Sequence, residues 1–126
     1  MFRYELRRFL RFSEDVARES GVTVQQYQLM LHSQGFASRQ WASIGEIAER
    51  MQALPHATVM LVTRCEQAGL VERRANADDA RVVEVHLTRK GRECLHEVAH
   101  KLELELGKLA DVITRAKAGV QGRGDS

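Results

Sequence analysis

The sequence predicts a mainly α-helical fold that carries a small β-hairpin, and three observations support this. Apolar residues recur three or four positions apart along most of the chain, which is the spacing of amphipathic helices. Residues 70–74 and 82–87 are instead β-branched or alternate between apolar and polar, which is typical of strands. With 126 residues, 44% of them hydrophobic, the chain can build one modest core. We therefore expect a single domain that spans residues 1–126.

The first two predicted helices precede residue 36. Apolar residues at positions 2, 6, 9, 10 and 16 give the first helix one apolar side, and Gly21 ends it. Thr23 is expected to cap the second helix, because Gln26 stands where it completes a capping box. This helix is expected to end near Gly35, and Trp41 is expected to lie in a short polar connector.

The third and fourth predicted helices are short and lie close together. Ser43 and Glu46 repeat the capping-box spacing and open a helix that runs through Met51. Pro55 suits the first turn of the next helix, because its missing N–H would have no partner there. Gly69 tolerates a positive φ and is expected to end this fourth helix after residue 68.

The hairpin and one long helix complete the chain. The polar residues 75–81 separate the two predicted strands and form the candidate wing. Thr88 is expected to cap a last helix that continues to about Lys117, whereas the Gly-rich residues 118–126 are expected to be disordered. The apolar positions of this helix are Leu95, Val98, Leu102, Leu106, Leu109 and Ile113.

Two helices joined by a tight turn and followed at once by a hairpin form a winged helix-turn-helix, whose second helix enters the major groove of DNA. We expect residues 23–87 to form this DNA-binding lobe, and residues 1–22 and 88–117 to form dimerisation helices. At about 100° per residue, one face of the fourth helix packs inward through Thr58, Leu61, Val62 and Cys65. The DNA contacts expected from the outward face and its flank are His56, Ala57, Val59, Met60, Thr63 and Arg64.

The apolar residues of this outward face have two interpretations. Val59 and Met60 could contact thymine methyl groups between hydrogen-bonding neighbours. Alternatively, either side chain could pack on another element of the same chain. Basic residues are dense from residue 64 to residue 92, and they add Arg73 and Arg74 to the expected DNA contacts.

Composition excludes several other classes of protein. No run of 18 apolar residues is present, and the amino terminus carries charges where a signal peptide needs an apolar stretch. Cys65 and Cys94 are expected to be reduced thiols rather than a disulfide framework. We therefore expect a cytoplasmic protein that has no membrane partner and no cofactor.

Several segments resemble the MarR family of winged helix-turn-helix transcriptional regulators over nearly the whole chain. Residues 23–27 (TVQQY) resemble the start of that family's second helix, and residues 61–71 (LVTRCEQAGLV) resemble its recognition helix running into the hairpin. Residues 79–81 (DAR) and 85–88 (VHLT), with Gly91, are similar to its wing signature. The resemblance implies a sequence-specific DNA-binding regulator, which we expect to act as a repressor.

By this resemblance, Arg81 is the wing residue that enters the minor groove, and Asp79 fixes its orientation. A narrow minor groove concentrates negative potential and attracts arginine, which agrees with this role. The alternative is a solvated turn with an incidental ion pair. The resemblance also implies a small aromatic ligand between the dimerisation helices and the DNA-binding lobes. Possible lining residues, for each of which a core role is the alternative, are Tyr4, Phe9, Tyr27 and His32.

The length of the last helix predicts a homodimer. At 1.5 Å per residue, residues 88–117 would extend about 45 Å, more than one winged-helix core can cover. Pairing this helix with the first helix of a second chain would place two recognition helices about 34–36 Å apart, which predicts a palindromic operator. The expected interface residues are Phe2, Leu6, Phe9, Leu102, Leu106, Leu109 and Ile113.

Two other functions are open. Ala80 and Met60 replace residues that are often basic or polar in the family, and with the low net charge of +2 they favour a winged-helix protein-interaction module without DNA binding. His96, Glu97 and His100 match the H-E-x-x-H spacing of zinc hydrolases. No third ligand follows at a recognisable spacing, so we expect no catalytic residue and no metal site.

Overall fold

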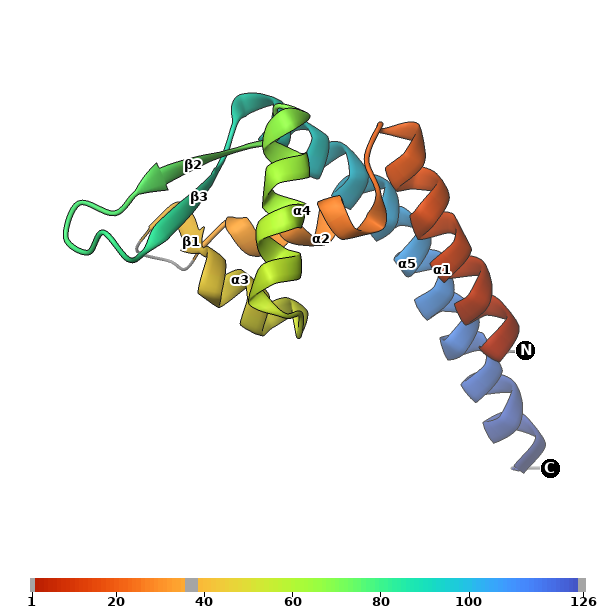
Figure 1. Ribbon diagram of the computed structural model, residues 1–126. Helices are drawn as coiled ribbons and strands as arrows, with labels where there is room; N and C mark the ends of the chain where they lie inside the picture. The colour runs from red at the N-terminus through yellow and green to blue at the C-terminus, as the bar shows by residue number, and fades with distance from the viewer. Residues whose placement is uncertain (1, 36–38, 125–126) are drawn as a thin grey trace.

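The computed structural model describes residues 2–35 and 39–124, without the side chains of Phe2, Phe9 and residues 120–124. A helical lobe carries a projecting hairpin at one side, and two long helices leave it at the other (Figure 1). The elements in chain order are α1 (Phe2–Glu19), α2 (Val24–Ser33), β1 (Trp41–Ser43), α3 (Ile44–Met51), α4 (Pro55–Gln67), β2 (Val71–Ala75), β3 (Val83–Leu87) and α5 (Arg89–Gly124).

Local capping signals place the ends of the helices where the sequence predicts them. The hydroxyl of Thr23 accepts a hydrogen bond from the backbone N–H of Gln26, and Ser43 does the same for Glu46, so both capping boxes are formed. Gly69 has a φ of +77° directly after α4. These caps satisfy backbone groups that a helix end leaves without intrahelical partners.

The sheet has three antiparallel strands in the order β1-β3-β2. Val85 in the middle of β3 pairs with Ala42 on one side and with Arg73 on the other. The strand β1 corrects the sequence prediction, which placed Trp41 in a connector. Three residues give too short a pattern to identify a strand, and β1 exists because β3 supplies its hydrogen-bonding partner.

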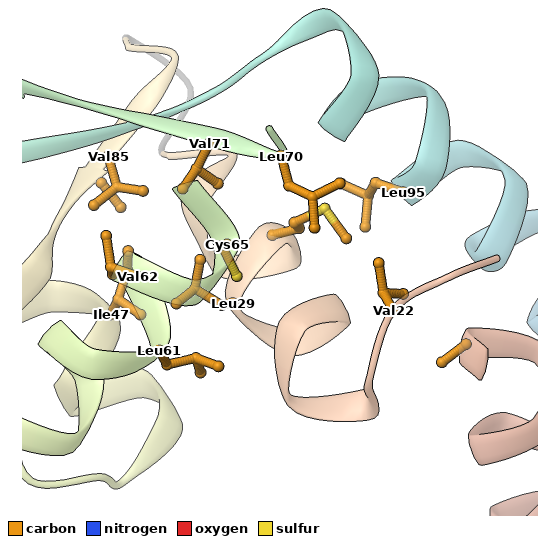
Figure 2. Packing of buried hydrophobic residues seen from close by; sticks show 13 residues of the cluster. Val22, Leu29, Ile47, Leu61, Val62, Cys65, Leu70, Val71, Val85 and Leu95 are labelled. Atoms are coloured by element: carbon orange, nitrogen blue, oxygen red, sulfur yellow. The ribbon is translucent and has the colours of Figure 1, made fainter. Parts of the chain in front are cut away.

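One apolar core joins the sheet to the helices of the lobe (Figure 2). Leu29 of α2, Ile47 of α3 and Val62 of α4 are completely buried, and Val85 of β3 covers them from the sheet. Leu95 near the start of α5 belongs to the same cluster. The core therefore holds α4 and the hairpin in one rigid lobe to which the base of α5 is attached.

Helix α5 is longer than the sequence predicts. It continues to Gly124 rather than to about Lys117, so residues 118–124, which we expected to be disordered, are helical. Extending an existing helix adds one hydrogen bond for each residue fixed, and no proline interrupts this segment. The final two residues of the expected tail lie outside the described residues. Beyond the lobe, α1 and α5 run side by side, with both chain termini at the same far end (Figure 1).

Candidate nucleic-acid interface

Helix α4 presents two chemically different faces. Thr58, Leu61, Val62 and Cys65 are buried, as the sequence predicts, and the hydroxyl of Thr58 donates to the carbonyl oxygen of Leu54 at 3.1 Å. The outward residues and their flank are exposed, apart from a half-buried Thr63; they are His56, Ala57, Val59, Met60, Thr63, Arg64 and Gln67.

The two apolar side chains on the outward face are not covered by the protein itself. Val59 is 38% exposed and Met60 is 47% exposed. Met60 and Arg64 line a groove of about 240 Å³, whose other residues include Gln25 of α2 and Met51 of α3. Packing against another part of the chain therefore does not account for the apolar residues on this side of α4.

The hydroxyl of Thr63 donates to the backbone carbonyl of Val59 at 3.0 Å. Its oxygen lone pairs can still accept a hydrogen bond from a base or another donor. Arg64 is exposed in the last turn of α4, where its guanidinium can reach away from the helix. Hydrogen-bonding groups thus surround the apolar side chains on one continuous surface.

The loop between β2 and β3 holds Arg81 in a defined orientation. The Nε and Nη2 atoms of Arg81 donate to the two carboxylate oxygens of Asp79 at 3.1 and 3.2 Å, and the backbone N–H of Arg81 also donates to Oδ1 at 3.0 Å. The hydrogen bonds from the side chain of Arg81, and then the one from its backbone N–H, lower the pKa of Asp79. The side chain of Arg81 is nevertheless 90% exposed. The pair leaves the guanidinium oriented but open to a partner.

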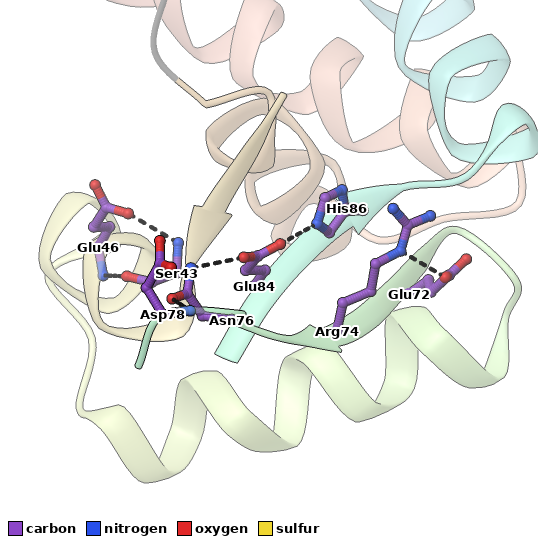
Figure 3. A network of polar contacts seen from close by, with 8 residues as sticks. All are labelled: Ser43, Glu46, Glu72, Arg74, Asn76, Asp78, Glu84 and His86. Carbon is purple, nitrogen blue, oxygen red and sulfur yellow. Dashed lines mark hydrogen bonds and ion pairs between the residues drawn. The ribbon is translucent and has the colours of Figure 1, made fainter. Parts of the chain in front are cut away.

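Asn76 organises the rest of the same loop. Its side-chain oxygen accepts hydrogen bonds from the backbone N–H groups of Asp78 and Asp79, at 3.0 and 2.9 Å. Its amide nitrogen donates to Glu84 at 2.8 Å, as Figure 3 shows. The acidic residues of the loop are thus part of an ordered turn, in which Asp79 pairs with Arg81.

Arg73 and Arg74, both expected to contact DNA, already have carboxylate partners. Nε and Nη2 of Arg73 donate to Oε1 of Glu66 on α4, at 3.2 and 2.8 Å, and its backbone N–H donates to Oε2. These bonds tie the base of the hairpin to α4, which is a structural role that sequence reasoning missed. Arg74 instead pairs with Glu72 and points to the opposite face of the sheet.

The expected dimer residues do not all face outward. Leu109 is 8% exposed because α1 of the same chain covers it, whereas Leu106 is 52% and Leu6 is 38% exposed. Leu102 and Ile113 are half-buried, and the side chains of Phe2 and Phe9 lie outside the described set. The outward apolar residues of α1 and α5 that the sequence analysis left out of the interface are Tyr4, Leu10 and Leu104.

The residues considered for a small ligand are dispersed. Tyr4 lies beside Arg8 on α1, whereas Tyr27 packs against the core. Burial, and then the charge of Glu103, raise the pKa of Tyr27. The backbone oxygen of His32 accepts a hydrogen bond from the side chain of Arg50. Burial, and then the charge of Arg50, lower the pKa of the His32 side chain. Phe9 falls outside the described side chains. A larger cavity, of about 530 Å³, lies elsewhere, between the sheet and α5.

The H-E-x-x-H residues stand on the surface of α5. His96, Glu97 and His100 are all exposed, and Glu97 pairs with Lys101 at 3.3 Å. Within the described part of the chain, no group of three or more histidine, cysteine, aspartate or glutamate residues could hold a metal ion. None of the described helices is both long and apolar enough to cross a membrane.

Cys65 lies in the core and Cys94 is half-buried. Burial raises the pKa of the Cys65 thiol to about 11. Burial also raises the pKa of Cys94. Both thiols are therefore protonated at neutral pH, and Cys65 acts as a small apolar core residue.

The fold and this surface together define a winged helix-turn-helix protein. The model of the MarR family matches residues 20–82, which is half of the chain, and the chain belongs to this family of transcription regulators. The members of this family are regulators rather than enzymes, so the H-E-x-x-H match is not a hydrolase site.

Individual relatives agree with this membership. The HTH-type transcriptional repressor MdtR of Bacillus subtilis (strain 168) is 42% identical over 48 residues, which cover 38% of this chain and 31% of MdtR. A mutant of S. aureus MepR bound to an oligodeoxyribonucleotide has a TM-score of 0.75 at 16% identity, covering 98% of this chain and 93% of that one. NadR in complex with 4-hydroxyphenylacetate has a TM-score of 0.73 at 20% identity, covering 93% of this chain and 81% of that one. The two structures share the fold with this chain.

Proposed function

We propose that this regulator binds double-stranded DNA as a homodimer and represses transcription from a palindromic operator in the cytoplasm. The observation that carries the proposal is the uncovered outward face of α4, with its mixed apolar and hydrogen-bonding side chains, in a lobe whose hairpin ends in an exposed arginine. A surface meant only for water would not favour exposed Val59 and Met60. A DNA groove offers partners for both kinds of side chain.

In this proposal α4 lies in the major groove. Val59 and Met60 contact thymine methyl groups, while His56, Thr63 and Arg64 bond to base edges or phosphates. The Glu66–Arg73 contacts support this arrangement, because they hold the hairpin at a fixed angle to α4. With Glu66 occupying Arg73, we assign Arg73 to positioning rather than to a direct DNA contact.

The wing would insert Arg81 into the adjacent minor groove. The bidentate contact with Asp79 restricts the guanidinium to one orientation before DNA arrives, which reduces the entropy lost on binding. The negative potential of a narrow minor groove attracts such a side chain. Arg81 is therefore the residue whose loss should weaken DNA binding most.

Dimerisation would use the outward apolar side chains of α1 and α5. In a single chain, more than half of each of these side chains is exposed: Tyr4, Leu10, Leu104 and Leu106. Two lobes joined through these helices would present two copies of α4 to successive turns of one DNA face, about 34–36 Å apart. The partner would thus be a second copy of the chain.

We further propose that a small aromatic ligand releases the dimer from DNA. The complex of NadR with 4-hydroxyphenylacetate supports this, since that protein has the same fold. Ligand binding would lower DNA affinity only if the ligand binds better to a conformation that fits the operator less well.

Selection of bound DNA from a random pool, repeated at two salt concentrations, tests the proposal. We expect an enriched palindrome and an affinity that falls steeply with salt, because cations are released from each neutralised phosphate. On the selected operator, Arg81→Ala should weaken binding by about tenfold or more, as for the loss of a specific groove contact. Arg115→Ala removes another exposed arginine, which pairs with Asp111 on α5, and this variant should bind DNA as the unchanged protein does.

The same experiment separates the alternative of a protein-interaction module. The proposal fails if the selection enriches no sequence and the DNA affinity of Arg81→Ala equals that of the unchanged protein. The exposed Met60, and an alanine rather than a basic residue at position 80, would then indicate a surface that binds another protein.

A further inference from the structure

The turn between α3 and α4 carries an exposed leucine where a polar cap is usual. Leu54 is the N-cap residue of α4 and is 76% exposed. Serine, threonine, asparagine and aspartate are preferred at such a position, because their side chains accept a hydrogen bond from the first turn of the helix. Thr23 and Ser43 follow this rule at α2 and α3. Leu54 instead leaves α4 without a side-chain cap.

The missing cap leaves backbone donors open at the start of α4. Pro55 has no N–H, and the N–H groups of His56 and Ala57 have no acceptor among the residues that the structure describes. A serine at position 54 would offer its hydroxyl oxygen to one of these donors. The leucine therefore lowers the stability of the helix and leaves most of its own side chain in water.

The backbone at Leu54 is nevertheless held in place. Its carbonyl oxygen accepts hydrogen bonds from the N–H and the hydroxyl of Thr58, at 3.0 and 3.1 Å. The preceding residue, Ala53, donates its N–H to the carbonyl oxygen of Ala48 in α3 at 2.9 Å. The turn lies at the end of α4 opposite its connection to β2 (Figure 1). Because this backbone is already fixed, little of its entropy is lost when a partner covers the leucine.

Leu54 belongs to an uncharged stretch of the protein surface. Residues 51–63 include no Asp, Glu, Lys or Arg, although these types make up 29% of the chain. Within residues 54–60 only Thr58 is buried, so the apolar residues of this segment are open to solvent; they are Leu54, Pro55, Ala57, Val59 and Met60. Without cations, this surface suits base edges better than phosphates. The base group that matches it is the methyl group of thymine in the major groove.

We infer that Leu54 recognises a thymine methyl group in each half of the operator. Residues at the start of a recognition helix contact base edges, and Leu54 stands directly before the first turn of α4. Its side chain is buried against the methyl group in the complex, which accounts for an apolar residue where a cap would stabilise the free protein. The inference rests on the proposed function and adds to it a base and a residue outside the expected DNA contacts.

Replacing each thymine of the selected operator by deoxyuridine tests the inference. Deoxyuridine lacks the methyl group and keeps the same base pairing. We expect one thymine of each half-site at which the replacement weakens binding of the unchanged protein but not of Leu54→Ser. Replacement in both half-sites should lower the affinity by about tenfold or more, because burial of one methyl group corresponds to about fourfold.

Thermal unfolding of the DNA-free variants separates recognition from folding. Leu54→Ser should raise the melting temperature by about 2–8 °C through the gained cap, while it weakens operator binding. A loss of affinity in a more stable variant is not caused by unfolding. As the control, Leu31→Ser removes an exposed leucine of α2 and should leave operator affinity and the deoxyuridine effects unchanged.

The inference is overturned if no deoxyuridine effect depends on Leu54, or if Leu54→Ser binds the operator as tightly as the unchanged protein. In both cases an enriched operator still supports DNA binding, so only the role of Leu54 fails. If the selection enriches no operator, the proposed function fails and recognition of thymine fails with it. The two failures are therefore distinguishable.

Discussion

Gly91, in the first turn of α5, lies against the backbone of Leu70, in the short connection between α4 and β2. A Cβ at this position would overlap the carbonyl oxygen of Leu70 and lie 3.0 Å from its carbonyl carbon. Backbone atoms cannot move aside as the tip of a flexible side chain can. Glycine is therefore required here by close approach of two backbones, although its own φ is ordinary for a helix. This requirement gives a physical reason for the glycine that ends the wing signature.

Gly91→Ala is expected to destabilise the protein by about 1–3 kcal/mol, the usual cost of overpacking a rigid site. Urea denaturation followed by circular dichroism measures the change. Gly107→Ala on the same helix is the matched control, because a Cβ there has no atom within 4 Å. That control should be stabilised by about 0.5–1 kcal/mol, as expected for alanine replacing glycine inside a helix. Equal effects of the two substitutions would contradict the packing argument.

At the scale of elements, the contact between Glu66 and Arg73 determines how the hairpin is held to α4. Both carboxylate oxygens are used, one by the guanidinium and the other by the backbone N–H. The backbone hydrogen bond from Arg73, then its side chain, lowers the pKa of Glu66. The contact therefore stabilises the folded state when Glu66 is ionised.

The folded-state pKa of Glu66 lies below its ordinary value of 4.5. This stabilisation is therefore complete when the pH is above 4.5, and it is lost as the pH falls through the lowered pKa. At pH 7, Glu66→Gln should reduce stability by about 1 kcal/mol or less, as is usual for a partly exposed pair. The difference from the unchanged protein should shrink below pH 4 in urea titrations. Glu93→Gln, which breaks the exposed pair with Arg89, serves as control. A pH-independent deficit would rule out ionisation of Glu66 as the cause.

At the scale of the whole molecule, α5 performs two packing tasks along its length. Its base enters the core of the lobe through Leu95 and Val98, and farther along Leu109 is covered by α1. Leu104 and Leu106 remain exposed on other sides of the same helix. An amphipathic helix with apolar residues outside its intramolecular contact surface offers them to a partner.

Leu106→Glu is expected to convert the proposed dimer to a monomer, because a charge would be buried in the interface. Sedimentation equilibrium measures the mass, and circular dichroism checks that the helices persist. Val59→Glu introduces the same charge at an exposed apolar residue of α4 and should leave the mass unchanged while abolishing DNA binding. A Leu106→Glu dimer as tight as the original would refute an interface through this residue.

The sequence by itself determined the features that depend on neighbouring residues. The capping boxes at Thr23 and Ser43, the turn at Gly69 and the inward face of α4 all follow from short-range spacing, and all are present in the structure. The candidate DNA surface could be predicted for the same reason, since one helix and one turn carry most of it. Its binding role remains a proposal.

Only the tertiary structure decided which of these surfaces meet. It made a strand of Trp41–Ser43, engaged Arg73 with Glu66 and covered Leu109 with α1. It also formed an open hollow whose lining residues are up to 62 positions apart in the chain, from Gln34 to His96. Such contacts depend on how elements pack across long sequence separations, and the periodicity of a single segment shows that it has an apolar side without showing what will cover it.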